Sequence, residues 1–218
     1  MPADAAEFVM TECLRLGNAT TERASDCPSR LIQQAKEGSA EAFEQIMLRY
    51  EQKVFATSWR MLGNEADARD AVQEVFLRVL KYIGSFKLDQ DFGGWLYRIV
   101  INTCRDARRR GLKARMFASL EAELESGACD ALRSEANHEA DAIVSQQRAL
   151  IRAALDTLTK KERAAIVLRD LEGLSTEEVA QILGSSATTV RSQICSARSK
   201  IRIYRDRLIN AKRPEMKS

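Results

Sequence analysis

The sequence has few of the residues that disulfide frameworks, metal sites and membrane spans require. It contains one histidine, His138, and five scattered cysteines that form no C-x-x-C pair. This spacing argues against disulfides and a zinc site, so we expect no bound metal or cofactor. No apolar run approaches the length of a membrane span, and the N-terminus lacks the pattern of a signal peptide. The sequence therefore predicts a cytoplasmic protein with no membrane insertion.

Proline and aromatic residues are also scarce. Only 3 of the 218 residues are proline and 6% are aromatic. No stretch alternates apolar and polar residues as a half-buried strand does, whereas the strong helix formers alanine, leucine, arginine and glutamate are abundant. With 45% hydrophobic residues, the chain can bury the core of one ordinary domain or two small ones. We therefore predict an all-α fold.

The residue combinations of an active site are missing. The single histidine lies in an acidic stretch, the cysteines have no paired base, and there is no glycine-rich phosphate loop. We therefore expect that the protein is not an enzyme.

Charge is unevenly distributed along the chain, although the net charge is only +3. Residues 95–115 hold seven bases and one acid, 117–141 hold seven acids and one base, and 186–213 hold eight bases and one acid. Two basic blocks separated by an acidic one suggest two polyanion-binding surfaces joined by a segment that binds no polyanion.

The best-specified helix is predicted over residues 64–83, with Asn64 as its N-cap. Its apolar stripe, which we expect to lie in the core, consists of Val72, Val75, Phe76, Val79, Leu80 and Ile83. Its polar face carries Asp70, Gln73, Glu74, Arg78 and Lys81. Spacing alone favours a solvated surface for this face. The run DARDAVQEVFLRVL, however, resembles the D-x-x-Q-[DE]-x-F signature of region 2 in bacterial RNA polymerase sigma factors, most closely the extracytoplasmic-function (ECF) group. The resemblance implies that Asp70, Gln73, Glu74 and Phe76 bind core RNA polymerase.

Two further helices are predicted in the same region. One begins after Ser39 as N-cap and is ended by Gly63. The other runs from Trp95 to about Arg110, after a loop that begins at Gly84. One face of this last helix carries Arg98, Asn102, Arg105 and Arg109. Such a cationic ridge favours contact with nucleic acid over solvation.

Single-stranded DNA requires a cationic track and faces for unstacked bases, which the ridge and the loop residue Phe86 would supply. Trp95 either wedges against the duplex or belongs to the core, and its inward position favours the core. The block from Phe92 to Arg110 resembles the promoter-melting and minus-ten segment of sigma factors. The residues assigned to minus-ten DNA are Phe86, Trp95, Arg98, Asn102, Arg105 and Arg109.

The C-terminal part predicts a helix-turn-helix. Two capping boxes, Thr159–Glu162 and Ser175–Glu178, open short helices, and Gly184 precedes a second helix with a basic outer face. The motif alone occurs in many regulators. The stretch LRDLEGLSTEEVAQILGSSATTVRS, however, resembles sigma region 4 nearly residue for residue.

A helix in the major groove reads base edges with its outward side chains and neutralises phosphates with others. The outward residues that we assign to minus-thirty-five DNA are Thr188, Thr189, Arg191, Ser192, Cys195 and Ser196, and the resemblance adds Arg169. Gln193 and Ser196 stand where the family often has arginines, so fewer charged contacts are expected.

The predicted organisation is two small helical domains joined by a flexible acidic linker. Its parts are a loosely ordered extension at 1–29, region 2 at 30–113, the linker at 114–144, region 4 at 145–212 and a tail at 213–218. The resemblance implies an ECF sigma factor that binds core RNA polymerase, directs it to double-stranded promoter DNA and aids melting. It also implies an anti-sigma partner. The alternatives are a stand-alone helix-turn-helix regulator and a protein-interaction module.

Overall fold

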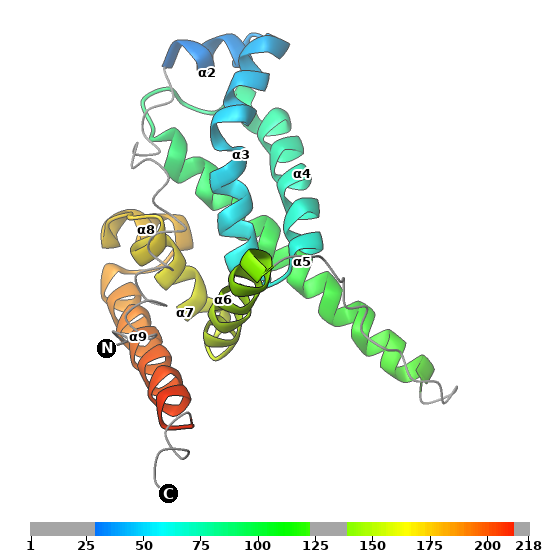
Figure 1. The fold of residues 1–218 in the computed structure, drawn as a ribbon. Helices are drawn as coiled ribbons and strands as arrows, with labels where there is room; N and C mark the ends of the chain where they lie inside the picture. Colours follow the sequence, from blue (N-terminus) through cyan, green and yellow to red (C-terminus); the bar gives the residue numbers. More distant parts are fainter. Residues whose placement is uncertain (1–28, 123–138, 212–218) are drawn as a thin grey trace, which may run out of the picture.

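The computed structural model describes residues 29–122 and 139–211 (Figure 1). Its regular elements, in order, are α2 (Ser29–Lys36), α3 (Ala40–Leu62), α4 (Glu65–Tyr82), the 3-10 turn η1 (Ile83–Ser85), α5 (Phe92–Ala122), α6 (Glu139–Asp156), α7 (Lys160–Ile166), the π-helical turn η2 (Val167–Leu171), α8 (Thr176–Leu183) and α9 (Ala187–Ala211). Every regular element in these ranges is helical, which confirms the predicted all-α fold. The predicted C-terminal tail and nearly all of the N-terminal extension lie outside the described residues.

Helices α2 to α5 form the first half of the molecule and share one core. Figure 1 shows α3 and α4 side by side, with α2 across one end. Ile46 of α3, Val75 of α4 and Val100 of α5 are fully buried where these three helices meet. The apolar periodicity of the three helices therefore produces a three-helix core, to which α2 adds Ile32.

Most of the stripe predicted on α4 is buried, but Leu80 is not. Val75, Phe76, Val79 and Ile83 belong to the core, and Val72 packs partly against it, whereas Leu80 is 54% exposed. Successive residues of a helix are rotated by about 100°, so Leu80 turns away from the side on which Val79 meets α3 and α5. The prediction that Leu80 lies in the core is wrong.

The predicted ends of α3 and α4 are confirmed by their capping hydrogen bonds. The Ala42 N–H donates to Ser39 Oγ (3.2 Å), and the Asp67 N–H donates to Asn64 Oδ1 (2.7 Å). Gly63 ends α3 with φ of 85°, a left-handed conformation that glycine adopts without steric cost. Only one residue, the cap Asn64, therefore separates Gly63 from α4, so the two helices fold back as antiparallel neighbours.

Helix α5 is longer than predicted at both ends. It begins at Phe92 because the Asp91 carboxylate accepts hydrogen bonds from the N–H groups of Gly93 (3.2 Å) and Gly94 (2.6 Å). A Cβ atom at residue 94 would lie 2.9 Å from Asp91 Oδ2, so a larger residue there would displace the capping carboxylate. At its other end α5 continues to Ala122, inside the segment predicted as linker. Two consecutive glycines usually indicate a loop, but the Asp91 cap places Gly93 and Gly94 in the first turn of the helix.

Helices α6 to α9 form the second half, and both predicted capping boxes are present. The Glu162 N–H donates to Thr159 Oγ1 (3.3 Å), and the Thr159 N–H donates to Glu162 Oε2 (2.8 Å). Ser175 and Glu178 make the same pair of bonds (3.2 and 2.6 Å). Gly184, with φ of 63°, ends α8 and allows the turn into α9. Helices α8 and α9 thus form the predicted helix-turn-helix.

The two halves pack against each other along α3 and α5. Figure 1 shows α8 and α9 on the opposite side of α3 from α4. Trp59 of α3 packs against a second apolar cluster, which consists of Ile151, Leu155, Leu158, Ile166 and Ala197. A side chain of the first half therefore helps to cover the core of the second.

Candidate protein and nucleic-acid interfaces

The outer face of α4 combines polar and apolar side chains. Asp70 and Gln73 are exposed, as predicted. Leu77 and Leu80 are also exposed, by 62% and 54%. Steps of three, four and three place these four residues on one side of the helix, which we call the α4 face. Adjacent exposed leucines on a well-packed helix are typical of a protein-binding surface. The sequence reasoning missed Leu77, although its spacing from Gln73 could have indicated it.

The other two residues assigned to this surface are engaged inside the first half. Phe76 is only 5% exposed and packs in the core beneath α4. Glu74 is half-buried, and its carboxylate accepts a hydrogen bond from Arg78 Nε (2.7 Å). Arg78 also donates to Asp106 of α5 (3.2 Å). Glu74 therefore belongs to an ion-pair network that joins α4 to α5.

The cationic ridge predicted on α5 is present. Arg98, Asn102 and Arg109 are exposed, and Arg105 is half-buried beside them on the same side of the helix. Arg109 Nη2 lies 3.7 Å from Asp106 Oδ1, a loose pairing that leaves the Arg109 side chain 72% exposed. Arg98 Nη2 donates to the Gln181 carbonyl oxygen of α8 (2.8 Å). The ridge is thus open along its length except at Arg98, where α8 contacts it.

The aromatic residues beside the ridge form a cluster. The ring of Phe86 lies 5.4 Å from that of Phe92 and 5.1 Å from that of Trp95, between centroids. Phe86 is only 2% exposed, so it lies in the core and presents no free face to a base. Trp95 is partly buried against the same cluster, consistent with its predicted place in the core. The sequence alone could not show whether Phe86 and Trp95 contact DNA or lie in the core, because the aromatic cluster joins a loop residue to residues of a helix.

The outward face of α9 carries most of the predicted minus-thirty-five residues. Thr188, Thr189, Arg191, Ser192 and Cys195 are exposed. Val190, Ile194 and Ala197 are buried on the opposite side and fix the orientation of the helix. This exposed set, without Ser196, is called the α9 face below. The N-terminal end of α9 is also the positive end of the helix dipole, which attracts phosphate.

Two further arginines of the second half lie outside the α9 face. Arg169 lies half-buried in η2, on a different element. Arg198, which the sequence reasoning did not single out, is exposed and pairs with Asp170 (2.7 Å). Arg191 pairs with the exposed Glu177 of α8 (3.1 Å). Exposed ion pairs of this kind are weak, so a phosphate can replace the carboxylate at Arg191.

Ser196 faces α7 instead of solvent. Its hydroxyl donates to Glu162 Oε1 (2.6 Å), and Lys200 Nζ donates to the same carboxylate (2.7 and 2.9 Å). Burial alone would raise the pKa of Glu162, but the hydrogen bonds from Lys200, Ser196 and Thr159 outweigh it and lower that pKa to about 2. Ser196 therefore helps to fix α9 on α7.

These contacts predict that two alanine substitutions in α9 affect different properties, DNA binding in one case and stability in the other. Arg191→Ala should weaken duplex binding and reduce the slope of log K against log salt by about 0.9, because one phosphate contact is lost. Ser196→Ala should leave that slope unchanged and destabilise the fold by about 1 kcal/mol, since it removes one hydrogen bond to a buried carboxylate. Filter binding at several salt concentrations and thermal unfolding measure the two effects. A reduced slope for Ser196→Ala would show that this residue reaches DNA.

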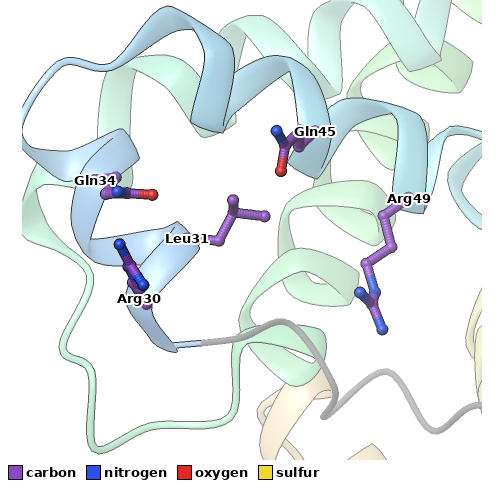
Figure 2. Close-up of a pocket in the computed structure, with 5 residues that line it drawn as sticks. All are labelled: Arg30, Leu31, Gln34, Gln45 and Arg49. Carbon is purple, nitrogen blue, oxygen red and sulfur yellow. The ribbon is translucent and has the colours of Figure 1, made fainter.

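A shallow surface pocket of about 270 Å³ lies between α2 and α3 (Figure 2). Its lining residues are Arg30, Leu31, Gln34, Gln45 and Arg49. The pocket is open to solvent. None of its lining residues belongs to the α4 face, the ridge on α5 or the α9 face. Residues 29–122 and 139–211 contain no group of three or more histidine, cysteine or acidic side chains that could hold a metal. Within the same residues, no helix is long and apolar enough to cross a membrane.

The architecture and its exposed faces correspond to two regions of sigma-70-type factors. Residues 46–114 match the family model "Sigma-70 region 2", and residues 148–201 match "Sigma-70, region 4". The first range holds the α4 face and the ridge, and the second holds the helix-turn-helix. The match over region 2 gives no support to a stand-alone helix-turn-helix regulator.

Similar proteins narrow the assignment to one group of sigma factors. The ECF RNA polymerase sigma-E factor of Escherichia coli strain K12 is 35% identical over 175 residues, which cover 78% of this chain and 90% of that protein. The ECF RNA polymerase sigma factor SigE of Mycolicibacterium smegmatis is 36% identical over 75% of this chain and 61% of that protein. The chain belongs to the ECF family of RNA polymerase sigma factors, which are transcription initiation factors.

Two solved structures share the fold. The structure of CnrH in complex with the cytosolic domain of CnrY has a TM-score of 0.60 and 27% identity, and covers 87% of this chain and 99% of that one. The sigma factor RpoE in complex with the anti-sigma factor NepR from Bartonella quintana has a TM-score of 0.55 and 22% identity, and covers 76% of this chain and 97% of that one.

Proposed function

We propose that the protein uses its three exposed faces for the three contacts of an initiating sigma factor. The α4 face binds core RNA polymerase, the ridge on α5 binds the melted minus-ten strand, and the α9 face enters the major groove of the minus-thirty-five duplex. The observation that supports this most is that one chain carries both regions in order, each with a face of suitable chemistry exposed. The functional domains proposed are 30–113 and 145–212, since the family matches fall almost entirely within them.

The α4 face suits a protein partner because two exposed leucines adjoin Gln73 and Asp70. An apolar centre with a polar surround is the usual composition of a protein interface. We assign Gln73, Leu77 and Leu80 to the centre of the polymerase contact. Phe76 and Glu74 act indirectly, by fixing α4 on the core and on α5.

The ridge and the α9 face suit two forms of DNA. A row of arginines with an exposed asparagine can follow a single strand through its phosphates. A helix that presents small polar side chains and one arginine at its N-terminal end can approach base edges closely. We infer that the chain works in the cytoplasm with the polymerase and has no catalytic activity of its own.

We also propose an anti-sigma partner. The support is that CnrH was solved with the cytosolic domain of CnrY, and RpoE of the same fold with the anti-sigma factor NepR. The exposed leucines of the α4 face offer such a partner the same apolar surface that the polymerase would use.

Reconstituted transcription tests the proposed function. Purified core polymerase, which does not initiate specifically, is combined with the full-length chain on genomic fragments, and run-off transcripts are sequenced. Discrete start sites preceded by shared minus-ten and minus-thirty-five elements are the expected result. A stand-alone regulator would bind DNA without starting transcripts, and an interaction module would do neither, so either result contradicts the proposal.

A further inference from the structure

A buried carboxylate joins the two halves of the molecule. Glu172 follows η2 in the second half, and its side chain is 8% exposed. Its Oε1 accepts a hydrogen bond from Arg60 Nη1 (2.8 Å), and its Oε2 accepts one from the Tyr97 hydroxyl (2.8 Å). The Thr57 hydroxyl lies 2.8 Å from Oε1 and 2.8 Å from the Lys53 carbonyl oxygen, so its single hydrogen serves one or the other. We call Glu172, Arg60, Tyr97 and Thr57 the carboxylate node.

Every partner of Glu172 in the node comes from the first half. A buried carboxylate is tolerated only when hydrogen bonds and an opposite charge replace water, and these are present only while the halves are in contact. Burial, together with the charge of Glu172, raises the pKa of Tyr97, so its hydroxyl stays protonated and remains a donor. The node is therefore complete in the closed arrangement and is taken apart when the halves separate.

Three further contacts join the two halves. Arg163 of α7 is only 1% exposed, and its Nη1 donates to the Met61 carbonyl oxygen of α3 (3.2 Å). Trp59 covers the apolar cluster of the second half. Across the same interface, Arg98 donates to the Gln181 carbonyl oxygen (2.8 Å). A residue of the proposed minus-ten ridge is thus held by the helix-turn-helix unit.

The closed arrangement cannot engage both promoter elements. Elements about 25 base pairs apart on a duplex with a rise of about 3.4 Å per pair are separated by about 85 Å. In this structure, α5 and α8, which belong to the two DNA-binding units, are joined by a direct hydrogen bond. The halves must therefore move apart before both can bind promoter DNA.

We infer that the carboxylate node is a latch that holds the free protein closed, with Arg98 engaged by the Gln181 carbonyl oxygen, and that Glu172 is its central residue. The inhibitory effect of engaging Arg98 rests on the proposed role of the ridge, whereas the closed state itself does not. Removing the charge-assisted bonds of Glu172 should shift the ratio of open to closed molecules by about ten- to a hundred-fold toward open.

Trp59 provides a reporter for the closed state. The chain has two tryptophans, so the full-length protein with Trp95→Phe reports on Trp59 alone. With Glu172→Ala added, we expect red-shifted emission, stronger acrylamide quenching and a larger radius of gyration by X-ray scattering. Tyr97→Phe, which keeps the packing, should give a smaller shift in the same direction and replaces Glu172→Ala if that variant does not fold. Unchanged emission and radius in the folded variants would overturn the latch.

Asp170→Ala is the matched control. Asp170 lies in η2, two positions before Glu172, but its carboxylate pairs with Arg198 inside the second half. Its loss should leave Trp59 emission and the radius of gyration as in the parent. Opening by Asp170→Ala to the same extent would show that the loss of any carboxylate there separates the halves, and would overturn the specific role of Glu172.

Binding to a short fluorescein-labelled single strand of mixed sequence tests whether the closed state, in which α8 engages Arg98, weakens DNA binding by the ridge. Glu172→Ala should bind several-fold more tightly than the parent, and Arg98→Ala in the same chain should remove the gain. Opening without tighter binding would overturn the inhibitory role of the latch. Opening with no single-strand binding by any variant, together with failed transcription, would contradict the proposed function and leave the latch intact.

Discussion

Replacement of Arg98, Arg105 and Arg109 together by alanine is expected to abolish promoter opening while leaving recruitment to the duplex largely intact. The three side chains occupy one side of α5, and among the residues that the structure describes none of them has a strong ion-pair partner that would keep it from phosphate. Each phosphate contact to a single strand contributes about 0.7 to the logarithmic salt dependence, so the slope should fall by about 2. Permanganate reactivity of promoter thymines measures opening, and titration at several salt concentrations measures the slope.

Arg69→Ala is the control for loss of a positive charge in the first half. Its guanidinium pairs with Glu65 of the same helix (2.6 Å) and points into solvent. That variant should open promoters as the parent does. Normal permanganate reactivity in the triple variant would show that the α5 ridge does not follow the melted strand.

The second large effect is expected on the α4 face. Gln73→Ala combined with Leu77→Ala should weaken binding of core polymerase by about ten- to a hundred-fold, because an apolar anchor at the centre of an interface is typically worth 2 kcal/mol or so. Both side chains are exposed and alanine is the best helix former, so the fold should be unaffected. Fluorescence competition for core polymerase measures the affinity, and circular dichroism checks the helix content.

Leu48→Ala is the matched control for this variant. Leu48 is 68% exposed but lies on α3, so its loss removes the same apolar area from a different helix. Core affinity should then remain that of the parent. If the Gln73 and Leu77 variant binds core as tightly as the Leu48 variant does, the polymerase contact lies elsewhere.

The local features of the fold followed from the sequence. Ser39, Asn64, Thr159 and Ser175 cap their helices as predicted, and Gly63 and Gly184 end theirs. These features involve hydrogen bonds between residues three or four positions apart, so the signal lies within one turn of the chain. The residues of the α9 face were also predictable, because the buried positions Val190, Ile194 and Ala197 fix a helix of known period.

The short helix α2 and the true start of α5 were not predicted. Helix α2 has only two buried residues, Ile32 and Ala35, which is too short a pattern to indicate a helix without α3 beside it. At α5, the consecutive glycines Gly93 and Gly94 indicated a loop, whereas the Asp91 carboxylate caps the helix there. Packing against α3 therefore determines α2, and the Asp91 carboxylate determines where α5 begins.

The burial and the hydrogen-bond partners of individual side chains depended on contacts between distant segments. Leu80 is exposed, Phe86 is buried and Ser196 faces Glu162 because neighbouring helices lie on particular sides of them, and periodicity does not specify which sides. Glu172 lies in a stretch that the sequence identifies as region 4, but its hydrogen-bond partners Arg60 and Tyr97 are 112 and 75 positions away. The sequence alone determined the class of fold and the family, and it indicated most of the residues on the faces that we propose for polymerase and DNA. Only the tertiary structure decided which of those faces are free, because burial and hydrogen bonding across the two halves arise from their packing and not from the order of residues within either one.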